Sequence, residues 1–294
     1  MKSQTRLVVG IATCGRATIL SETITFLAKQ ERPPDQILVS YAEPEDVGDA
    51  PQQFPQASFL RTPLGLTRQR NAILTQAADS DLLLFIDDDF FPDPQYVATT
   101  EHFFLNHPDV VASTGTLLAN DIKGPGLTVA HAKSIVAGHT GPYGEQQITP
   151  LFFVYGCNMC LRMAPIRKHN LRFDETLPLY GCYEDWDISR QLARFGAIVR
   201  ISNACGVHLS AKVGRMSGVR MGYAQVANPI YLARKGTFPW SLVFKVIVGP
   251  CLKNLLRSLA PEAYIDRLGR FCGNLAAFRD LLAGRLSPEQ IIDL

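Results

Sequence analysis

The chain has 294 residues, of which 47% are hydrophobic and 19% are charged, the composition of an ordinary soluble globular protein. This length allows one large domain or two small ones with a substantial core. The seven cysteines are scattered and odd in number, which argues against a disulfide framework and suits a reducing cytoplasm. The N-terminal apolar run is short and lacks a small-residue cleavage site, so we expect no signal peptide and a cytoplasmic protein.

The net charge of +2 is unevenly distributed along the chain. Residues 188–261 contain eleven Lys or Arg residues and no Asp or Glu, whereas the rest of the chain has 18 basic and 27 acidic residues. A basic segment of this kind indicates an anionic partner, such as phosphate groups, a nucleic acid or an acidic membrane surface.

Strands and helices alternate through the first part of the chain. Apolar runs bounded by turn residues predict strands, and apolar residues at helical spacing predict helices. The predicted strands cover residues 6–13, 36–41, 57–62 and 81–87, and the predicted helices cover residues 17–30 and 65–78. This alternation indicates right-handed βαβ units in a mostly parallel sheet, and ligands bind such sheets outside the carboxyl ends of the strands.

The rest of the chain is less regular. Gly and Pro residues interrupt short apolar runs over about residues 110–160, where we expect mixed strands and long loops. Residues 183–202 predict a helix closed by Gly196 and followed by a strand. We therefore expect an α/β domain over residues 1–220, with a donor half to about 110 and an acceptor half to about 220, and a C-terminal helical extension over 221–294.

The fourth predicted strand ends in "FIDDDFFPDP", which places Asp87, Asp88 and Asp89 at its carboxyl end. Carboxylates clustered there suit a hard divalent cation, Mg²⁺ or Mn²⁺, which could also bind a substrate diphosphate. Alternate strand residues share a face, so Asp87 and Asp89 can converge while Asp88 points elsewhere. The alternatives are a plain acidic turn and a phosphatase with an aspartyl-phosphate, although Phe91 stands where the phosphatase would want Thr or Val.

Three acidic residues, Glu184, Asp185 and Asp187, begin the helix predicted in "GCYEDWDISRQL". Acids at a helix start interact favourably with the helix dipole, which needs no function. Asp185 could instead be a general base if a hydroxyl lies within hydrogen-bond reach, and Asp187 faces away from it on a helix. The spacing favours the functional interpretation.

Two further candidates carry weaker signals. His208 follows a probable strand and is either structural or a ligand for a metal or phosphate. Cys157 and Cys160 form a C-x-x-C on a strand-like segment, where residues three apart point to opposite faces, so buried thiols are favoured over zinc. No nucleotide-binding glycine motif is present, because Arg16 and Ala17 replace the Lys-Ser/Thr of a phosphate-binding loop.

The longest apolar stretch near the C-terminus covers residues 238–259. Lys245 and Pro250 interrupt it, and it is too short to span a membrane. It predicts either a core helix or an interfacial helix. The residues expected to anchor or flank an interfacial helix are Arg234, Lys235, Trp240, Phe244, Lys245, Lys253 and Arg257.

In this order and at these spacings, the motifs resemble those of a family-2 glycosyltransferase with the GT-A fold, over about residues 5–210. The matching segments are "VVGIATCGRATILSETITFLAKQERPPDQILVS", "LGLTRQRNAIL", "FIDDDFFPDP", "GCNMCLRM" and "FDETLPLYGCYEDWDISRQLARFG". One position departs from the family pattern. Tyr41 and Ala42 stand where the family has an Asp that contacts the nucleobase, so Tyr41 could stack on the base or Asp46 could substitute.

The resemblance implies a role for each matching residue. Asp87, Asp89 and His208 would hold a divalent cation, Mn²⁺ or Mg²⁺, on the diphosphate of a sugar nucleotide. Asp185 would be the catalytic base, with Glu184 and Trp186 contacting the acceptor. Asp88 would lie near the ribose or the sugar, and Thr13 would line the base pocket. The residues implied for donor binding are Thr13, Arg16, Tyr41, Arg70, Asn71 and Asp88.

We therefore expect an inverting, metal-dependent glycosyltransferase in polysaccharide or glycolipid assembly. Its partners would be a nucleotide-diphosphate sugar, an acceptor that is a sugar, a lipid-linked compound or another hydroxyl, and the anionic inner face of a membrane, with no nucleic acid. His208, Lys212 and Arg215 could stabilise the leaving diphosphate. The alternatives are a nucleotidyltransferase on a similar sheet and a non-catalytic protein that binds carbohydrate or sugar nucleotides.

Overall fold

A computed structural model of the chain describes residues 5–141, 146–214 and 216–294, and Arg215 therefore lies outside the described residues. These residues form a nine-stranded sheet of order β3-β2-β1-β4-β8-β6-β9-β5, with β7 added beside β9. The strands are β1 (Leu7–Ala12), β2 (Gln36–Tyr41), β3 (Ser58–Arg61), β4 (Leu82–Ile86), β5 (Phe90–Pro92), β6 (Val110–Asn120), β7 (Ile148–Pro150), β8 (Asn158–Arg162) and β9 (Ala197–His208).

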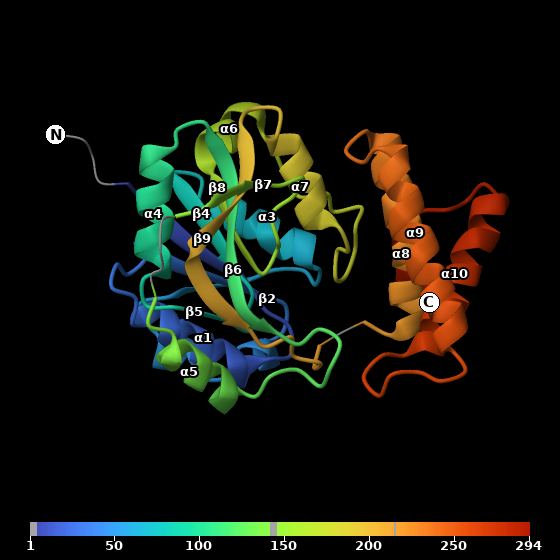
Figure 1. The fold of residues 1–294 in the computed structure, drawn as a ribbon, viewed down its shortest axis with the longest axis horizontal. Helices are drawn as coiled ribbons and strands as arrows, with labels where there is room; N and C mark the ends of the chain where they lie inside the picture. The colour runs from blue at the N-terminus through green and yellow to red at the C-terminus, as the bar shows by residue number, and fades with distance from the viewer. Residues whose placement is uncertain (1–4, 142–145, 215) are drawn as a thin grey trace.

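Helices cover both faces of the sheet, and three more lie beside it (Figure 1). The helices are α1 (Ala17–Ala28), α2 (Ala50–Gln53), α3 (Leu66–Gln76), α4 (Tyr96–Asn106), α5 (Val129–Gly138), α6 (Met163–His169), α7 (Glu184–Leu192), α8 (Gly218–Lys235), α9 (Trp240–Arg257) and α10 (Arg267–Leu282). Side chains alternate along each strand: Val9 packs in one core cluster with α1 and α4, whereas Val8 packs in another with α3, α6 and α7.

The predicted βαβ units are confirmed. β1 pairs in parallel with β2 and β4, and β2 pairs in parallel with β3. All five residues of β4 are buried, because helices cover both sides of the sheet and leave no face for polar residues. The chain leaves β4 at its carboxyl end and turns at Asp87 into the short strand β5.

The second half of the sheet is more mixed than predicted. β8 lies antiparallel to both β4 and β6, and β9 runs parallel to β6 but antiparallel to β5 and β7. The expectation of a mostly parallel sheet therefore holds only for the first half. The loops expected over residues 110–160 also contain a helix, α5, which Thr128 caps by accepting a hydrogen bond from the backbone N–H of His131.

The C-terminal helices form a cluster of their own on the α7 side of the sheet (Figure 1). The predicted division at residue 220 falls within the first turn of α8, which Ser217 caps. α8 and α10 pack closely at two glycines: a Cβ on Gly222 would lie 2.0 Å from the carbonyl oxygen of Arg270, and one on Gly273 would lie 2.0 Å from that of Val219. No helix in the described parts of the chain is both long and apolar enough to cross a membrane.

A buried charge network ties this cluster to α7. Asp187 is fully buried on α7, and Lys235, in the last turn of α8, donates to it over 2.7 Å. Lys235 also donates to Asp174 over 2.6 Å, and Thr237 donates to Asp187 over 2.7 Å. Lys235 was expected beside an interfacial helix, but in the structure its ammonium group pairs with Asp187 and Asp174, and 28% of its side chain remains exposed.

Replacing Lys235 with alanine should lower the free energy of unfolding by about 1–3 kcal/mol, because the buried Asp187 carboxylate loses its cation but keeps the hydrogen bonds from Thr237 and Gln191. Chemical denaturation measured by circular dichroism tests this value. Lys245 is exposed on α9, and its replacement with alanine is the matched control, with an expected change within about 0.5 kcal/mol. Equal losses in the two variants would contradict a structural role for the Lys235–Asp187 pair.

Candidate active site

A cavity of about 470 Å³ opens where β1 and β4 end, between the sheet and the first turns of α8. The carboxyl ends of parallel strands are where ligands bind in sheets of this kind. Two groups of predicted residues meet in this cavity. The predicted residues that line it are Thr13, Arg16, Arg70, Asp87, Asp88, Glu184, Asp185 and His208.

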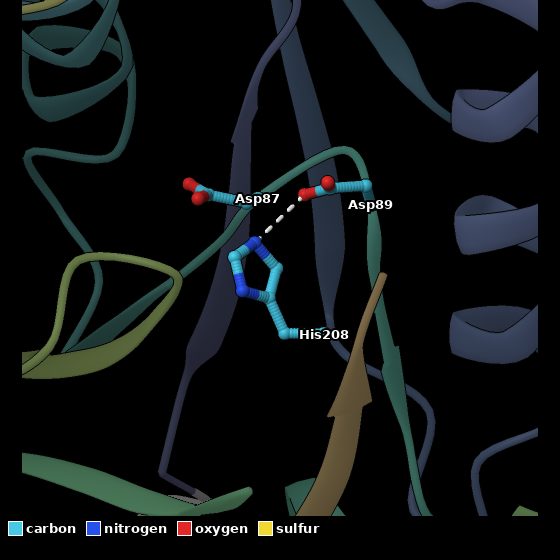
Figure 2. A group of neighbouring side chains, drawn as sticks. All are labelled: Asp87, Asp89 and His208. Carbon is cyan, nitrogen blue, oxygen red and sulfur yellow. Dashed lines mark ion pairs between the residues drawn. The ribbon is translucent and has the colours of Figure 1, made fainter. Parts of the chain in front are cut away.

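Asp87, Asp89 and His208 lie close together (Figure 2), and two of them, Asp87 and His208, line the cavity. Each of the three offers one ligand atom, and these atoms all lie within 4.8 Å of one another. Two carboxylates and an imidazole form a donor set that suits Mn²⁺ and is also compatible with Mg²⁺. β5 pairs with β9 so that Phe90 lies opposite His208. This register places His208 next to the aspartates, although it is more than a hundred residues away in the sequence.

The Asp89 carboxylate is ionised and paired. Its Oδ1 atom lies 3.1 Å from Nε2 of His208, and Oδ2 accepts a hydrogen bond from the backbone N–H of Ala211. Burial raises the pKa of Asp89, but the hydrogen bond and charge of His208, together with Arg16, outweigh burial and lower the pKa to about 2. The same contact raises the pKa of His208 against the opposing effect of burial. A metal bound here would take the place of the proton on His208.

Asp88 does not belong to this group of possible metal ligands. β4 ends at Ile86, so the turn that follows it, and not the strand alternation expected from the sequence, sets the direction of the Asp88 side chain. Its carboxylate accepts hydrogen bonds from the Thr13 hydroxyl and from the Arg16 guanidinium, each over 2.7 Å. Arg16 also lies 3.6 Å from Asp89, so one cation serves two aspartates. Burial nevertheless raises the pKa of Asp88 to about 6 against the charge of Arg16.

The adjacent aspartates are tolerated for two reasons. Arg16 lies beside both Asp88 and Asp89, and His208 pairs with Asp89. Burial also favours the protonated form of Asp88.

A buried arginine connects the two ends of the cavity. Arg70, on α3, forms an ion pair with Glu184 and lies 3.3 Å from Asp87, and it donates to the carbonyl of Gly156 over 3.0 Å. Burial and neighbouring Asp185 raise the pKa of Glu184, and Arg70 opposes them. Glu184 therefore lines the cavity while its carboxylate is paired with Arg70.

Asp185 lies in the first turn of α7, at the wall of the cavity. Its Oδ2 atom accepts a hydrogen bond from the backbone N–H of Gly156 over 3.0 Å, and Oδ1 accepts from that of Trp186 over 2.9 Å. Tyr183, just before the helix, has a left-handed backbone with φ of 72°. Burial raises the pKa of Asp185 to about 6, although Arg70 and the two N–H groups oppose the rise. An anchored carboxylate with this pKa can accept a proton near neutral pH.

Four predicted site residues lie outside the set that lines the cavity: Tyr41, Asn71, Asp89 and Trp186. The Asn71 amide donates to the carbonyl of Phe173 and to Glu175, and so joins α3 to the segment before α7. Trp186 stacks on Phe153 with ring centroids 3.8 Å apart, in an aromatic cluster that reaches the C-terminal helices.

The loop after β2 is where the resemblance places a nucleobase contact. Asp46 is buried, and its carboxylate accepts hydrogen bonds from the backbone N–H groups of Gly15, Ala42 and Glu43. Tyr41 packs against the core and is also absent from the described lining of the cavity. Asp46 therefore ties the β1–α1 loop to the β2 loop.

The remaining candidates are Lys212 and the two cysteines of the C-x-x-C motif. The Lys212 ammonium donates to the carbonyls of Asp121 and Ile122. Cys157 and Cys160 are buried thiols whose pKa values burial raises, and neither belongs to the one metal-competent group found among the described residues.

One wall of the cavity was not predicted at all. It consists of apolar side chains from three separated segments, and no local pattern marks them as site residues. They are Leu64, Leu179, Tyr180, Cys182, Met216 and Met221. Only Tyr180 and Cys182 could have been suspected, from their position just before Glu184.

Comparison with known proteins agrees with the fold. The family model described as "Glycosyl transferase family 2" matches residues 8–166. No curated protein matches the chain.

Among solved structures, the mannosyltransferase PcManGT of Pyrobaculum calidifontis, in complex with GDP-Man and Mn²⁺, has a TM-score of 0.56 at 14% identity, over 99% of this chain and 86% of that one. Residues 1–349 of S. aureus TarS have a TM-score of 0.53 at 15% identity, over 94% and 92%. The same TarS segment in complex with UDP has a TM-score of 0.50 at 15% identity, over 94% and 92%. At these identities the likeness is one of fold.

Proposed function

The chain belongs to glycosyl transferase family 2, and from this we propose that it moves a hexose from a nucleotide-diphosphate sugar to an acceptor hydroxyl, with inversion. One observation carries the proposal: a group able to hold a divalent cation and an anchored carboxylate of raised pKa border the same cavity. The first suits a donor diphosphate and the second suits an acceptor hydroxyl.

The donor end is formed by Asp87, Asp89 and His208, which would hold Mn²⁺ or Mg²⁺. When bound, the cation supplies positive charge for the diphosphate as it leaves. Arg16 lies beside the same aspartates and adds a permanent positive charge. The structures of PcManGT with GDP-Man and Mn²⁺ and of TarS with UDP support a nucleotide donor.

Asp185 carries the proton chemistry. In the proposed step its carboxylate takes the proton of the acceptor hydroxyl, and the hydroxyl oxygen forms a bond to the anomeric carbon. The bond from that carbon to the diphosphate oxygen breaks on the opposite face, so the configuration inverts. The backbone N–H groups of Gly156 and Trp186 hold the carboxylate in place for this transfer.

Thermal unfolding in the presence of a panel of sugar nucleotides, each with and without Mn²⁺, tests the donor assignment. A ligand that binds only the folded state raises the midpoint of unfolding. Because the proposed site holds the donor diphosphate through the cation, a true donor should raise the midpoint only when Mn²⁺ is present. The anomeric proton of the transfer product, observed by NMR, then distinguishes inversion from retention. A panel without any cation-dependent shift would contradict the proposal.

The proposal extends to polysaccharide or glycolipid assembly at the inner face of a membrane. α9 buries one face, with Val243 and Ile247, and exposes another apolar face along its length. Phe244 is 70% exposed, and Leu259, just beyond the helix, is 93% exposed. Lys245 and Arg257 are exposed as well, and α9 contains no acidic residue. Each basic residue near an anionic surface contributes about 1 kcal/mol to binding.

Vesicle co-sedimentation should show binding to anionic but not neutral vesicles, with weaker binding as salt increases. Replacing both Trp240 and Phe244 with serine should abolish binding, because it removes two exposed aromatic side chains from the apolar face. Leu105→Ser, on α4 and 60% exposed, is the matched control and should bind like the wild type. Equal sedimentation with neutral and anionic vesicles, or none with either, would exclude the electrostatic contact.

A further inference from the structure

The apolar wall of the cavity lies beside the proposed base. Its six side chains come from the loop before α3, the loop before α7 and the start of α8, and they are Leu64, Leu179, Tyr180, Cys182, Met216 and Met221. The second loop leads directly into Glu184 and Asp185. A group held against this wall is therefore adjacent to the hydroxyl that Asp185 would deprotonate.

The wall presents large apolar side chains to solvent in the absence of a ligand. Leu64 is 51% exposed and Tyr180 is 50% exposed, and both line the cavity. Below them, the sulfur atoms of Cys182 and Met221 lie 3.6 Å apart. Exposed apolar surface inside a cavity is covered favourably by an apolar ligand, and methionine adapts its shape to such ligands.

Two polar residues on α8 that line the cavity near this wall have partners within the protein. The Gln225 side-chain oxygen accepts from Asn254, and the Arg220 guanidinium donates to the carbonyls of Ile292 and Leu294. These contacts engage groups that could otherwise bind sugar hydroxyls, and among the six wall residues only Tyr180 carries a hydroxyl. An unpartnered hydroxyl is costly to bury. The wall therefore favours an apolar group over a second sugar.

The loop before α7, which carries three of the six wall residues, is held by hydrogen bonds to the start of α3. The backbone N–H of Leu66 donates to the carbonyl of Leu179 over 2.8 Å, and the Thr67 hydroxyl donates to that of Leu177 over 3.1 Å. Leu179 has a left-handed backbone with φ of 56°. A preformed wall lowers the entropic cost of binding an apolar group.

We infer that the acceptor carries an apolar group, alkyl or aryl, next to its reacting hydroxyl, and that the start of α8 forms part of its binding site. This inference rests on the proposed function and names the acceptor class for it. The Asp185 base and the donor end are unchanged by it, so α8 contributes affinity for the acceptor and not the chemistry.

Acceptors that differ only in the aglycone test the inference: methyl, hexyl and phenyl glycosides of each of several sugars, with donor saturating and nucleoside diphosphate release as the readout. Burial of one methylene is worth about four-fold in affinity. We expect KM at least ten-fold lower for the hexyl or the phenyl member than for the methyl member, with kcat similar. The hexyl and phenyl arms distinguish a lipid-like from an aromatic acceptor.

Met221→Gln and Leu64→Ser should each raise KM for the preferred glycoside several-fold while leaving donor affinity unchanged. Leu64 is at the rim, so its replacement does not disturb the core, and Leu105→Ser on α4 is again the matched control. Binding of the same glycosides to enzyme loaded with nucleoside diphosphate and Mn²⁺ is measured by calorimetry. Equal affinities for methyl, hexyl and phenyl members would overturn the inference, whereas absence of donor binding would overturn the proposed function instead.

Discussion

Asp185→Asn should lower kcat by about 10²–10⁴-fold, because the amide keeps the shape of the carboxylate but cannot accept a proton. Its side-chain oxygen can still accept a hydrogen bond from Gly156, so the local fold should persist. Donor affinity should barely change, because Asp185 is not among the residues that would hold the cation. Steady-state kinetics of nucleoside diphosphate release, with calorimetry for donor binding, measure the two effects separately.

Asp79→Asn is the matched control, since Asp79 precedes β4 at the opposite end of that strand and its side chain is 72% exposed. This variant should transfer sugar at the wild-type rate. If Asp185→Asn also does so, Asp185 is only a helix-terminal acid and the mechanism is wrong.

The pH dependence of transfer follows from the same residue. Burial raises the pKa of Asp185 to about 6, and the base acts only when it is ionised. In the wild type kcat should therefore fall as the pH drops below about 6, and the residual rate of Asp185→Asn should lack this dependence. A wild-type profile that is flat from pH 5 to 8, about the range over which such a group titrates, would contradict the assignment.

Asp89→Asn should abolish the part of nucleotide affinity that depends on a divalent cation. Asparagine can still accept the hydrogen bond from Ala211. It removes one of the two carboxylate charges from the group formed by Asp87, Asp89 and His208. Affinity for UDP or GDP with Mn²⁺ should then fall to the value without Mn²⁺. Circular dichroism confirms that the variant is folded, and an unchanged response to Mn²⁺ would mean that the acids form only a turn.

The first half of the fold could be predicted because its signals are local. β4 is predicted over residues 81–87 and observed over Leu82–Ile86, since a strand covered on both faces is a continuous apolar run ended by charge. The antiparallel insertion of β8 could not be predicted in this way, because its partners are set by tertiary packing. α5 was missed because Gly and Pro around it are typical of loops.

The acids of the site were predicted from topology, whereas their partners were not. The sequence places Asp87 and Asp89 at a strand end, but nothing local indicates that Arg70 joins Asp87 to Glu184. The pairing of Lys235 depends on Asp187, which is distant in the chain and buried. The apolar wall could not be predicted for the same reason, because Met221 lines the cavity only once α8 has packed against the rest of the fold.

The central claim is that the cavity binds a nucleotide diphosphate and a divalent cation together. Calorimetric titration of UDP and GDP into the wild-type protein, with and without Mn²⁺, measures this coupling directly. The Mn²⁺ titration, with and without nucleotide, must give the same factor, because coupling between two ligands is reciprocal. We predict a factor of about 5–150 for the correct nucleotide. Equal affinities of both nucleotides with and without Mn²⁺ would contradict the claim.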